Sequence, residues 1–562
     1  DQEIQGSGVV ELDLPRLAAP DGSAAPAPSP GAKQPHSLFR IDLHADTLAV
    51  DDDLVAALSE EGRRMLRDFD FRGSARMDVS IHSTERAELE VTGDVNLLSA
   101  SISYKLLPYV LELGKGRLQI FGDKSLVFTD VATPEGAKPF VVFNGSLTTQ
   151  GTERTLNFDF DIKELKFDEK LIDALPPTLA SFVTSMKLGG VYQGRIEASY
   201  TFDEADPKKF KILYAGQDVS AREASVDFGV RIHDMIAHGS FAGGMSPEHP
   251  HRLSGRVFVE SAWFNRLHLT QGDVDFALGQ EHPAIAMARR GEKIEGRDYL
   301  PPKTFQDRLV EENVKGTFQM LVHSNDVYGG KVDGFLYVDT GTFRDMAGDF
   351  VGSKFDVARA ALDVFGANGT GTAGTASGAI SFHGKSGDFL SIEGAGSGAI
   401  QEAKLVELPL FLGLLSLIFG DNSSRHYFHE VLVKYGISGG FFRAPSKDGI
   451  VIRSSGVKLE GGGTMDFSGN LDLTLQPYLL DFKIPLVDQI LSLIKKGVAQ
   501  VRLVGDLSNP KAQFATAGGI FTIGLDGSKP AQPIPLPADL REGAPKEREG
   551  APKEKDLPPG PK

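Results

Sequence analysis

Two glycine-rich segments of this 562-residue chain come close to patterns that carry chemistry. Residues 436–440 read Gly-Ile-Ser-Gly-Gly, which matches the turn that presents a nucleophilic serine. That chemistry needs a following helix and a later histidine, yet the next residues read as a strand and no histidine follows His429. Residues 384–386 end like a phosphate-binding loop, but Ala379 stands where its first glycine is required. Neither segment predicts an active site.

The histidines do not form a convincing metal site either. His426, His429 and Glu430 follow the order His-x-x-His-Glu, which fits neither known zinc-protease arrangement, and no third ligand stands out. His249 and His251 lie in a polar segment that we interpret as a loop. We expect these histidines to be surface or packing residues, and the many carboxylates to be solvated on the polar faces of strands. We therefore predict that the protein is not an enzyme and uses no metal or cofactor.

Composition excludes further classes. The net charge of −17 argues against nucleic acid as a partner, because phosphate binding needs a basic surface. The chain has no cysteine, which excludes disulfides and thiolate-held clusters. No run of 18 apolar residues is present, so no membrane-spanning helix is expected within the sequence. The longest mainly apolar run, 408–419, predicts a buried or interfacial helix.

Apolar and polar residues alternate over several long segments, which is the signature of a half-buried strand. The clearest is 465–475, which we interpret as one continuous ribbon, and the pattern returns at 156–162, 226–232 and, more loosely, 332–338. With 63 glycines available for turns and bulges, the chain is expected to be mainly β. We predict an elongated, twisted antiparallel sheet that forms an open apolar groove, with a few short capping helices.

The chain divides by composition into four regions. A Pro- and Ala-rich segment and a charged tail with two copies of Arg-Glu-Gly-Ala-Pro-Lys-Glu have too little apolar content to form a core. The predicted regions are a flexible linker at 1–36, a repeating groove body at 37–384 with helices at about 53–68 and 173–187, a C-terminal region at 385–520, and a disordered tail at 521–562.

An internal similarity relates residues 57–81 to residues 174–198. Each copy reads as a short amphipathic helix, a glycine (Gly73 or Gly190) and a strand, which points to a repeated supersecondary unit. Asp51–Asp53 are expected to cap the first helix, and Pro176–Pro177 suit the first turn of the second.

Two apolar helices are also expected near the C-terminus, at 408–419 and 484–497. We expect them to close sheet ends or fill a core. The alternative is that one of them contacts a membrane or a partner.

Residues 385–515 resemble the C-terminal region of AsmA-like proteins, the bacterial group that includes AsmA, YhdP and TamB. The resemblance rests on the glycine-alternating segment 394–400, on Leu408-Pro409-Leu410 and Ile484-Pro485-Leu486 opening their helices, on 461–473, and on Val504-Gly-Asp-Leu-Ser-Asn-Pro510. It implies a periplasmic protein, anchored to the inner membrane by an N-terminal segment that this chain lacks. Its partners would be phospholipid and proteins of the inner and outer membranes or the envelope.

Alternating strands and the resemblance favour the same function. We predict a non-enzymatic lipid-transfer or outer-membrane homeostasis protein that holds phospholipid acyl chains in a hydrophobic β-groove. The alternative is a structural or adhesive β-solenoid whose core is filled by its own side chains. The predicted groove-lining residues are Leu156, Phe158, Phe160, Ile162, Val226, Phe228, Val230, Ile232, Met465, Phe467, Leu471, Leu473 and Leu475.

Overall fold

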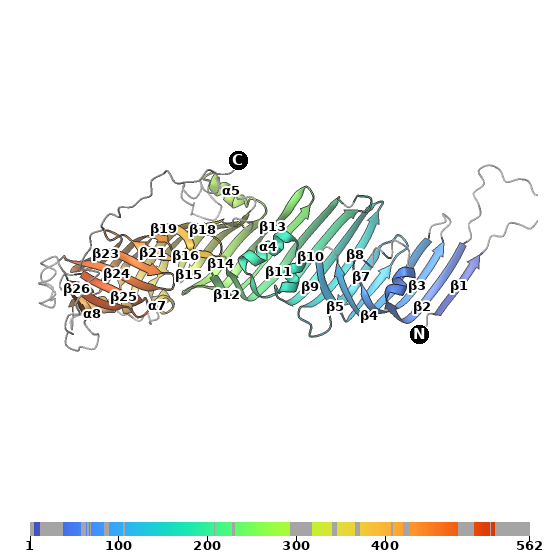
Figure 1. Ribbon diagram of the computed structural model, residues 1–562, viewed down its shortest axis with the longest axis horizontal. Coiled ribbons are helices and arrows are strands. Elements are labelled where there is room, and N and C mark those ends of the chain that lie inside the picture. Colours follow the sequence, from blue (N-terminus) through green and yellow to red (C-terminus); the bar gives the residue numbers. More distant parts are fainter. Residues whose placement is uncertain are drawn as a thin grey trace, which may run out of the picture. The chain divides into compact units, whose positions relative to one another are not determined.

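The protein is mainly β, with one large antiparallel sheet and a few short helices, as the sequence predicts (Figure 1). The computed structural model describes residues 5–11, 38–57, 63, 67, 69–83, 89–104, 107–206, 208–227, 231–292, 317–339, 345–365, 371–405, 408–419, 427–480, 500–516 and 519–522. The predicted helix at 484–497 lies outside these residues, as do 12–36 of the linker predicted at 1–36 and 523–562 of the tail predicted at 521–562. Residues 5–11 of the predicted linker form a strand, and residues 521–522 of the predicted tail end another.

The described chain runs through short helices and long strands. The helices are α1 Asp52–Ala57, α3 Glu169–Ala174, α4 Pro177–Met186, α5 Pro283–Arg289, α7 Val357–Phe365 and α8 Pro409–Phe419. The strands up to the middle of the chain are β1 Gln5–Glu11, β2 Leu38–Val50, β3 Arg72–Ser83, β4 Leu89–Tyr104, β5 Leu107–Leu113, β6 Lys115–Ile120, β7 Leu126–Ala132, β8 Phe140–Gln150, β9 Glu153–Leu165, β10 Gly189–Asp203, β11 Phe210–Asp227, β12 Arg231–Ser246, β13 His249–Phe264 and β14 Leu267–Leu278. The later strands are β15 Thr317–Val327, β16 Gly330–Asp339, β17 Asp345–Asp356, β18 Ala373–Lys385, β19 Asp388–Lys404, β20 Phe428–Ser438, β21 Phe441–Ala444, β22 Ile450–Ser454, β23 Val457–Asp466, β24 Asn470–Leu479, β25 Gln500–Asp506, β26 Lys511–Thr516 and β27 Gly519–Thr522.

The chain forms two compact units. Unit 1 comprises Asp1–Val364, Thr375–Ala399 and Tyr435–Phe442, and unit 2 comprises Phe365–Gly374, Ile400–Lys434 and Arg443–Lys562. In unit 1 successive strands pair antiparallel in chain order from β1 to β4 and from β6 to β18, while β4 pairs with both β5 and β6. Such a meander needs only short turns between neighbours, which suits a glycine-rich chain.

The helices of unit 1 begin where their capping residues predict. Asp51 accepts a hydrogen bond from the backbone N–H of Leu54 at 3.0 Å at the start of α1. Pro177 is the first residue of α4, where its missing N–H leaves no bond unmade. The segment predicted as one helix at 173–187 contains the end of α3 and the whole of α4.

The junction between helix and strand repeats three times. Gly73 and Gly190 are the second residues of β3 and β10 and have φ of 137° and 111°, which glycine adopts readily. Gly374, the second residue of β18, follows α7 and has φ of 140°. It is a third instance, which the internal similarity of the sequence did not reveal. A Cβ on any of the three would lie within 3.0 Å of a small residue on the next strand, namely Ala100, Ala224 and Ala403.

Two of the predicted ribbons are hairpins, not single strands. The segment 465–475 contains the end of β23, a turn and the start of β24, with Met465 opposite Leu471. Asp466 makes the turn, because its carboxylate accepts hydrogen bonds from the backbone N–H groups of Ser468 and Asn470, both at 2.9 Å. In the same way, β11 ends and β12 begins within 226–232.

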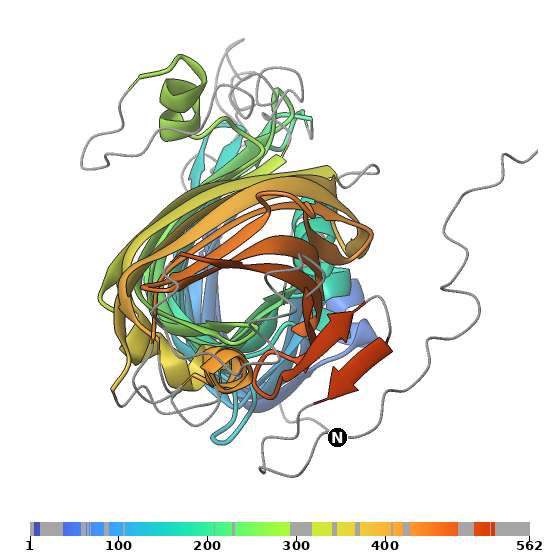
Figure 2. The ribbon, with the colours of Figure 1, turned by 90° about the vertical axis from the view of Figure 1, so that its left-hand side faces the viewer.

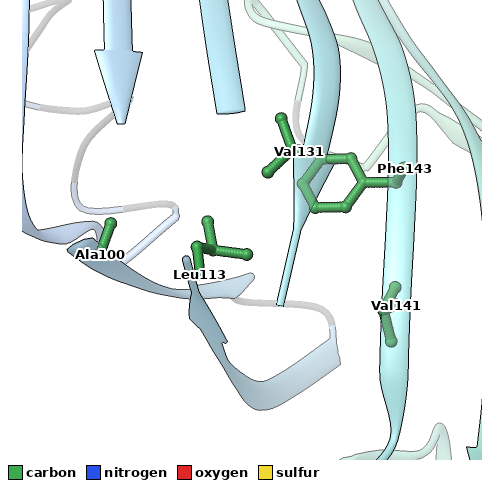
Figure 3. Close-up of a cluster of buried hydrophobic side chains, with 5 residues drawn as sticks. All are labelled: Ala100, Leu113, Val131, Val141 and Phe143. Carbon is green, nitrogen blue, oxygen red and sulfur yellow. The ribbon is translucent and has the colours of Figure 1, made fainter. Parts of the chain in front are cut away.

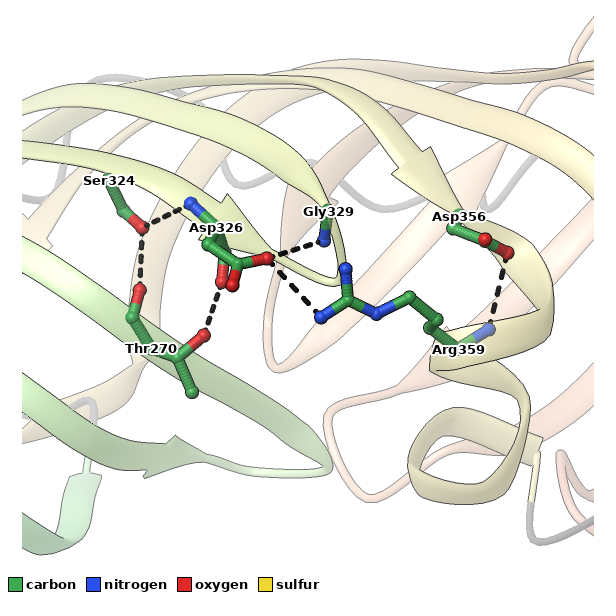
Figure 4. Close-up of polar contacts among 6 residues, drawn as sticks. All are labelled: Thr270, Ser324, Asp326, Gly329, Asp356 and Arg359. Carbon is green, nitrogen blue, oxygen red and sulfur yellow. Dashed lines mark hydrogen bonds and ion pairs between the residues drawn. The ribbon is translucent and has the colours of Figure 1, made fainter.

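Helix α7 is fastened to strands of unit 1 by a polar network (Figure 4). The carboxylate of Asp326 accepts a hydrogen bond from Gly329 N at 3.0 Å and pairs with the Arg359 guanidinium at 3.3 Å. The Ser324 hydroxyl donates to the carbonyl oxygen of Thr270 on β14 at 2.7 Å. Since Asp326 and Gly329 form the β15–β16 turn and Arg359 lies on α7, the network joins the turn to the helix.

Candidate functional site: the apolar face of unit 1

The strand register of unit 1 joins apolar residues into continuous rows. Residues directly opposite each other in an antiparallel pair point to the same face, so a chain of such pairs marks one face of the sheet. We call the following set the first row: Ala45, Met77, Val95, Leu118, Phe128, Gly145, Phe158, Ala198, Tyr214, Gly243, Leu253, Leu278, Phe318, Val338, Met346 and Gly384. Apart from the hydroxyl of Tyr214, every side chain in it is apolar or absent.

Two parallel rows flank the first on the same face. The second row is Val131, Phe143, Phe160, Ile196, Gly216, Phe241, Gly255, Phe276, Met320, Leu336, Gly348 and Phe382. The third row is Leu43, Val79, Gly93, Ile120, Leu126, Leu147, Leu156, Tyr200, Ile212 and Met245. We call the three rows together the apolar face.

The opposite face of the same strands is charged. Arg195 donates a hydrogen bond from Nε to Asp159 on the neighbouring strand at 2.7 Å. Arg256 pairs with Asp273 at 3.0 Å. Exposed pairs of this kind contribute little to stability, but they keep one side of the sheet compatible with water.

The apolar face is concave and self-filled between β4 and β10. Tyr104 on β4 and Tyr200 on β10 have ring centroids 6.1 Å apart, although β6 to β9 separate their strands in the sheet. Rings so far apart in the pairing order meet only if the sheet curves toward this face, and Figure 2 shows the curvature of these strands. Phe69 closes the same region, with its ring centroid 4.9 Å from Tyr104.

Two buried clusters occupy this region. Leu113 and Ala100 meet Val131, Val141 and Phe143 across the interior (Figure 3). The second cluster is Leu126, Leu147 and Leu156, each at most 5% exposed. This part of the apolar face is therefore a packed hydrophobic core.

From β10 to β14 most of the large apolar side chains of the rows remain half-buried. They are Ile196, Tyr200, Ile212, Tyr214, Phe241, Met245 and Phe276. Burial deepens at Leu278 and Phe318, where Phe182 from α4 packs with its ring 4.8 Å from that of Phe318. A contiguous apolar surface that keeps contact with water is costly and usually marks a binding surface.

The predicted lining residues of unit 1 fall into three groups. Leu156 is 3% exposed and belongs to the packed core. Phe158, Phe160 and Ile162 are half-buried and pack against the cluster that contains Phe143. Val226 and Ile232 are half-buried and face each other in the β11–β12 hairpin. Phe228 and Val230 lie outside the described residues.

The predicted lining residues of unit 2 belong to a different environment. Leu471 and Leu475 are 7% and 0% exposed, whereas Met465, Phe467 and Leu473 are half-buried.

Helix α8 is part of the core of unit 2. It packs against β26, and the ring of Phe411 lies 5.9 Å from that of Phe428 on β20. Leu414, Leu415 and Ile418 are fully buried. The apolar run at 408–419 is thus a core helix, which is one of the two roles expected for it.

One polar pair interrupts the apolar face, and sequence reasoning missed it. The Tyr214 hydroxyl and His251 Nε2 are hydrogen-bonded, and their rings stack 5.6 Å apart. Burial lowers the pKa of His251 and raises the pKa of Tyr214, so both are neutral at pH 7. The predicted polar loop at His249 and His251 is wrong, because both residues lie on β13, where His251 is a packing histidine.

The segments that approached catalytic patterns are turns between strands. Residues 436–438 end β20 and residues 439–440 connect it to β21, while residues 384–385 end β18 and residues 386–387 connect it to β19. His429 lies on β20, and His426 lies outside the described residues. Among the residues that the structure describes, no three His, Asp or Glu side chains gather as metal ligands.

Comparison of the chain with protein families, with curated proteins and with solved structures finds no match. None of the helices in the described part of the chain is long and apolar enough to cross a membrane. The AsmA-like resemblance therefore rests on sequence motifs alone.

Proposed function

We propose that the apolar face of unit 1 binds the acyl chains of phospholipids and catalyses no reaction on them. The observation that supports this is the continuity of the three rows across the strands of unit 1, together with their half-buried state between β10 and β14. A surface of this kind offers an extended apolar contact and almost no hydrogen-bonding specificity, which suits a hydrocarbon chain.

The energetics are favourable for such a ligand. Burial of each methylene contributes about 0.8 kcal/mol, so a chain of roughly sixteen carbons gains on the order of 10 kcal/mol. Because successive strands repeat the same apolar positions, a bound chain could shift along the face with little change in free energy. Transfer along the face would then need no chemical step.

The AsmA-like resemblance supports a place for this activity in the bacterial envelope. On this proposal the protein works in the periplasm, exchanges phospholipid with the inner or outer membrane, and contacts envelope proteins there. The ion pairs on the opposite face, such as Arg195 with Asp159, would keep the protein soluble while it carries lipid.

A second candidate function is favoured by the packed cores. The clusters around Phe143 and Leu147, and the burial of α8, are what a structural β-protein with a self-filled interior would have. On this reading the half-buried residues from β10 to β14 would be covered by the protein itself.

Lipid recovery from the purified full chain separates the two functions. We expect organic extraction and native mass spectrometry to recover phospholipid with the wild-type protein. Ile212→Asp, on the third row, should lower the lipid recovered, because burying an acyl chain against an ionised carboxylate is costly. The matched control is Leu213→Asp, since Leu213 is 47% exposed on the opposite face of the same strand.

Two results would count against acyl-chain binding. One is a wild-type protein that carries no phospholipid. The other is an equal loss of lipid in Ile212→Asp and Leu213→Asp, which would mean that the side of the sheet does not matter.

A further inference from the structure

Aromatic rings on the apolar face lean over glycines of the neighbouring strand. Gly216 on β11 lies directly opposite Phe241 on β12. A Cβ added to Gly216 would meet the Phe241 ring closer than 3.0 Å, a separation that real Cβ atoms essentially never show. The tip of the ring therefore occupies the space that any other side chain at 216 would fill.

The same arrangement recurs along the face. Within the first and second rows, the directly opposed pairs are Gly145 with Phe158, Gly216 with Phe241, Gly243 with Tyr214, Gly255 with Phe276, and Gly348 with Phe382. In every pair the glycine Cβ would lie closer than 3.0 Å to the ring. All five belong to the first or second row.

The geometry sets the direction of each ring. Opposed Cβ atoms in an antiparallel pair are about 4.5–5.5 Å apart, so a ring that reaches the opposite glycine lies along the sheet. With a side chain opposite, the ring would have to stand away from the sheet, as side chains on strands ordinarily do. The glycines thus leave a low surface where an upright ring would project.

We propose that the opposed glycines of the half-buried part of the face, Gly216, Gly243 and Gly255 on β11 to β13, are specificity-determining residues, which hold the aromatic rings flat so that an unbranched acyl chain can lie across the strands. This inference rests on the proposed acyl-chain function and names the residues that shape the site. An upright ring would block the path of a chain at that strand. Flat rings also present their faces, which are apolar contact surfaces for methylenes.

Gly216→Ala tests the proposal with little disturbance of the backbone. The three atoms nearest to a Cβ at this position are all side-chain atoms, two from Phe241 and one from Val219. The ring can therefore rotate away without displacing a strand. The control is Gly272→Ala, because the nearest atom to a Cβ there is on Val259 at 3.7 Å, an ordinary contact.

Binding is measured on the full chain with vesicles of phosphatidylethanolamine and phosphatidylglycerol that carry a trace of pyrene-labelled phospholipid. Gly216→Ala should weaken uptake of the labelled lipid by at least about fourfold, the equivalent of one methylene of lost burial. Gly272→Ala should bind like the wild type. Replacing Phe241 by Leu in the Gly216→Ala background should restore uptake, because the shorter side chain no longer needs the space above residue 216.

The possible results distinguish the role of the glycines from acyl-chain binding itself. Wild-type uptake with unchanged uptake by Gly216→Ala overturns the role of the glycines and leaves acyl-chain binding intact. A wild-type protein that takes up no labelled lipid overturns both. Far-UV circular dichroism establishes that each variant is folded, and failure of the Leu replacement to restore uptake also overturns the inference.

Discussion

Replacing Phe143 by Ala should distinguish the packed part of the apolar face from its half-buried part. Phe143 is 3% exposed, and its ring centroid lies 5.7 Å from that of Phe158 and 5.5 Å from that of Phe160. Truncation of a buried Phe to Ala typically costs about 3–5 kcal/mol, and the aromatic contacts on two sides place this site near the upper part of that range. We expect a loss of about 4 kcal/mol.

Ile212→Ala is the comparison, because Ile212 lies on the same face but is half-buried. Because the side chain is half-buried, the truncation removes about half of its transfer free energy, so the expected decrease in the free energy of unfolding is about 1–2 kcal/mol. The single tryptophan, Trp263, lies on β13 of unit 1 and stacks on His268 at 4.5 Å. Its fluorescence in urea titrations therefore reports the unfolding of unit 1.

The comparison has a clear refutation. If Phe143→Ala costs less than about 1 kcal/mol, the interior between β4 and β10 is not a packed core. If Ile212→Ala costs as much as Phe143→Ala, the region from β10 to β14 is equally well covered, which favours the self-filled structural protein.

Three further predictions concern single polar groups. Burial raises the pKa of Asp349, which is 3% exposed, to about 6. When the pKa of a carboxyl is higher in the folded state than in the unfolded state, the protein loses stability as the pH rises above the unfolded-state pKa. Asp349→Asn should therefore stabilise the protein at pH 7 by up to about 3 kcal/mol and have little effect at pH 4, as measured by urea unfolding at each pH. The hydrogen bond to Asp78 raises the pKa of His44. The contribution of this pair to stability is therefore complete below the unfolded-state pKa of 6.5 and is lost as the pH rises through the folded-state pKa. In Asp78→Asn the pKa of His44, measured by NMR titration, should be lower than in the wild type. Asp356 accepts hydrogen bonds from Ala358 N at 2.8 Å and from Arg359 N at 3.3 Å at the start of α7, the second of which is drawn in Figure 4. Asp356→Ala should therefore lower the free energy of unfolding by about 1 kcal/mol in thermal unfolding, and Asp356→Asn should keep most of the stability that the cap provides.

Several elements of the fold could be predicted from the sequence, because short stretches of neighbouring residues determine them. Alternation over 156–162 and 332–338 predicts segments that the structure places within single strands, β9 and β16. The cap at Asp51 and the first-turn proline at Pro177 likewise act over a few residues. Signals of this kind are readable because the residues that cause the structure are neighbours in the chain.

Alternation alone could not tell a strand from a hairpin. Met465 and Leu471 keep the same parity across the turn made by Asp466, so both sides of the hairpin continue one pattern. The same holds for Val226 and Ile232. Asp466 and Gly469 were the available signal, since an Asx turn before a glycine at φ of 95° marks a reversal.

Sequence by itself determined which residues are apolar and which face of a strand they share. Only the tertiary structure decided which of those faces became core, because burial depends on what lies opposite in space. Tyr104 meets Tyr200 across the curved sheet and both pack against the cluster of Leu156, so Leu156 is buried, while Ile212, with the same alternation, stays half-buried. The periodicity of apolar residues tells which face of a strand each side chain is on. Whether that face is covered depends on the curvature of the sheet and on segments that are distant in the chain.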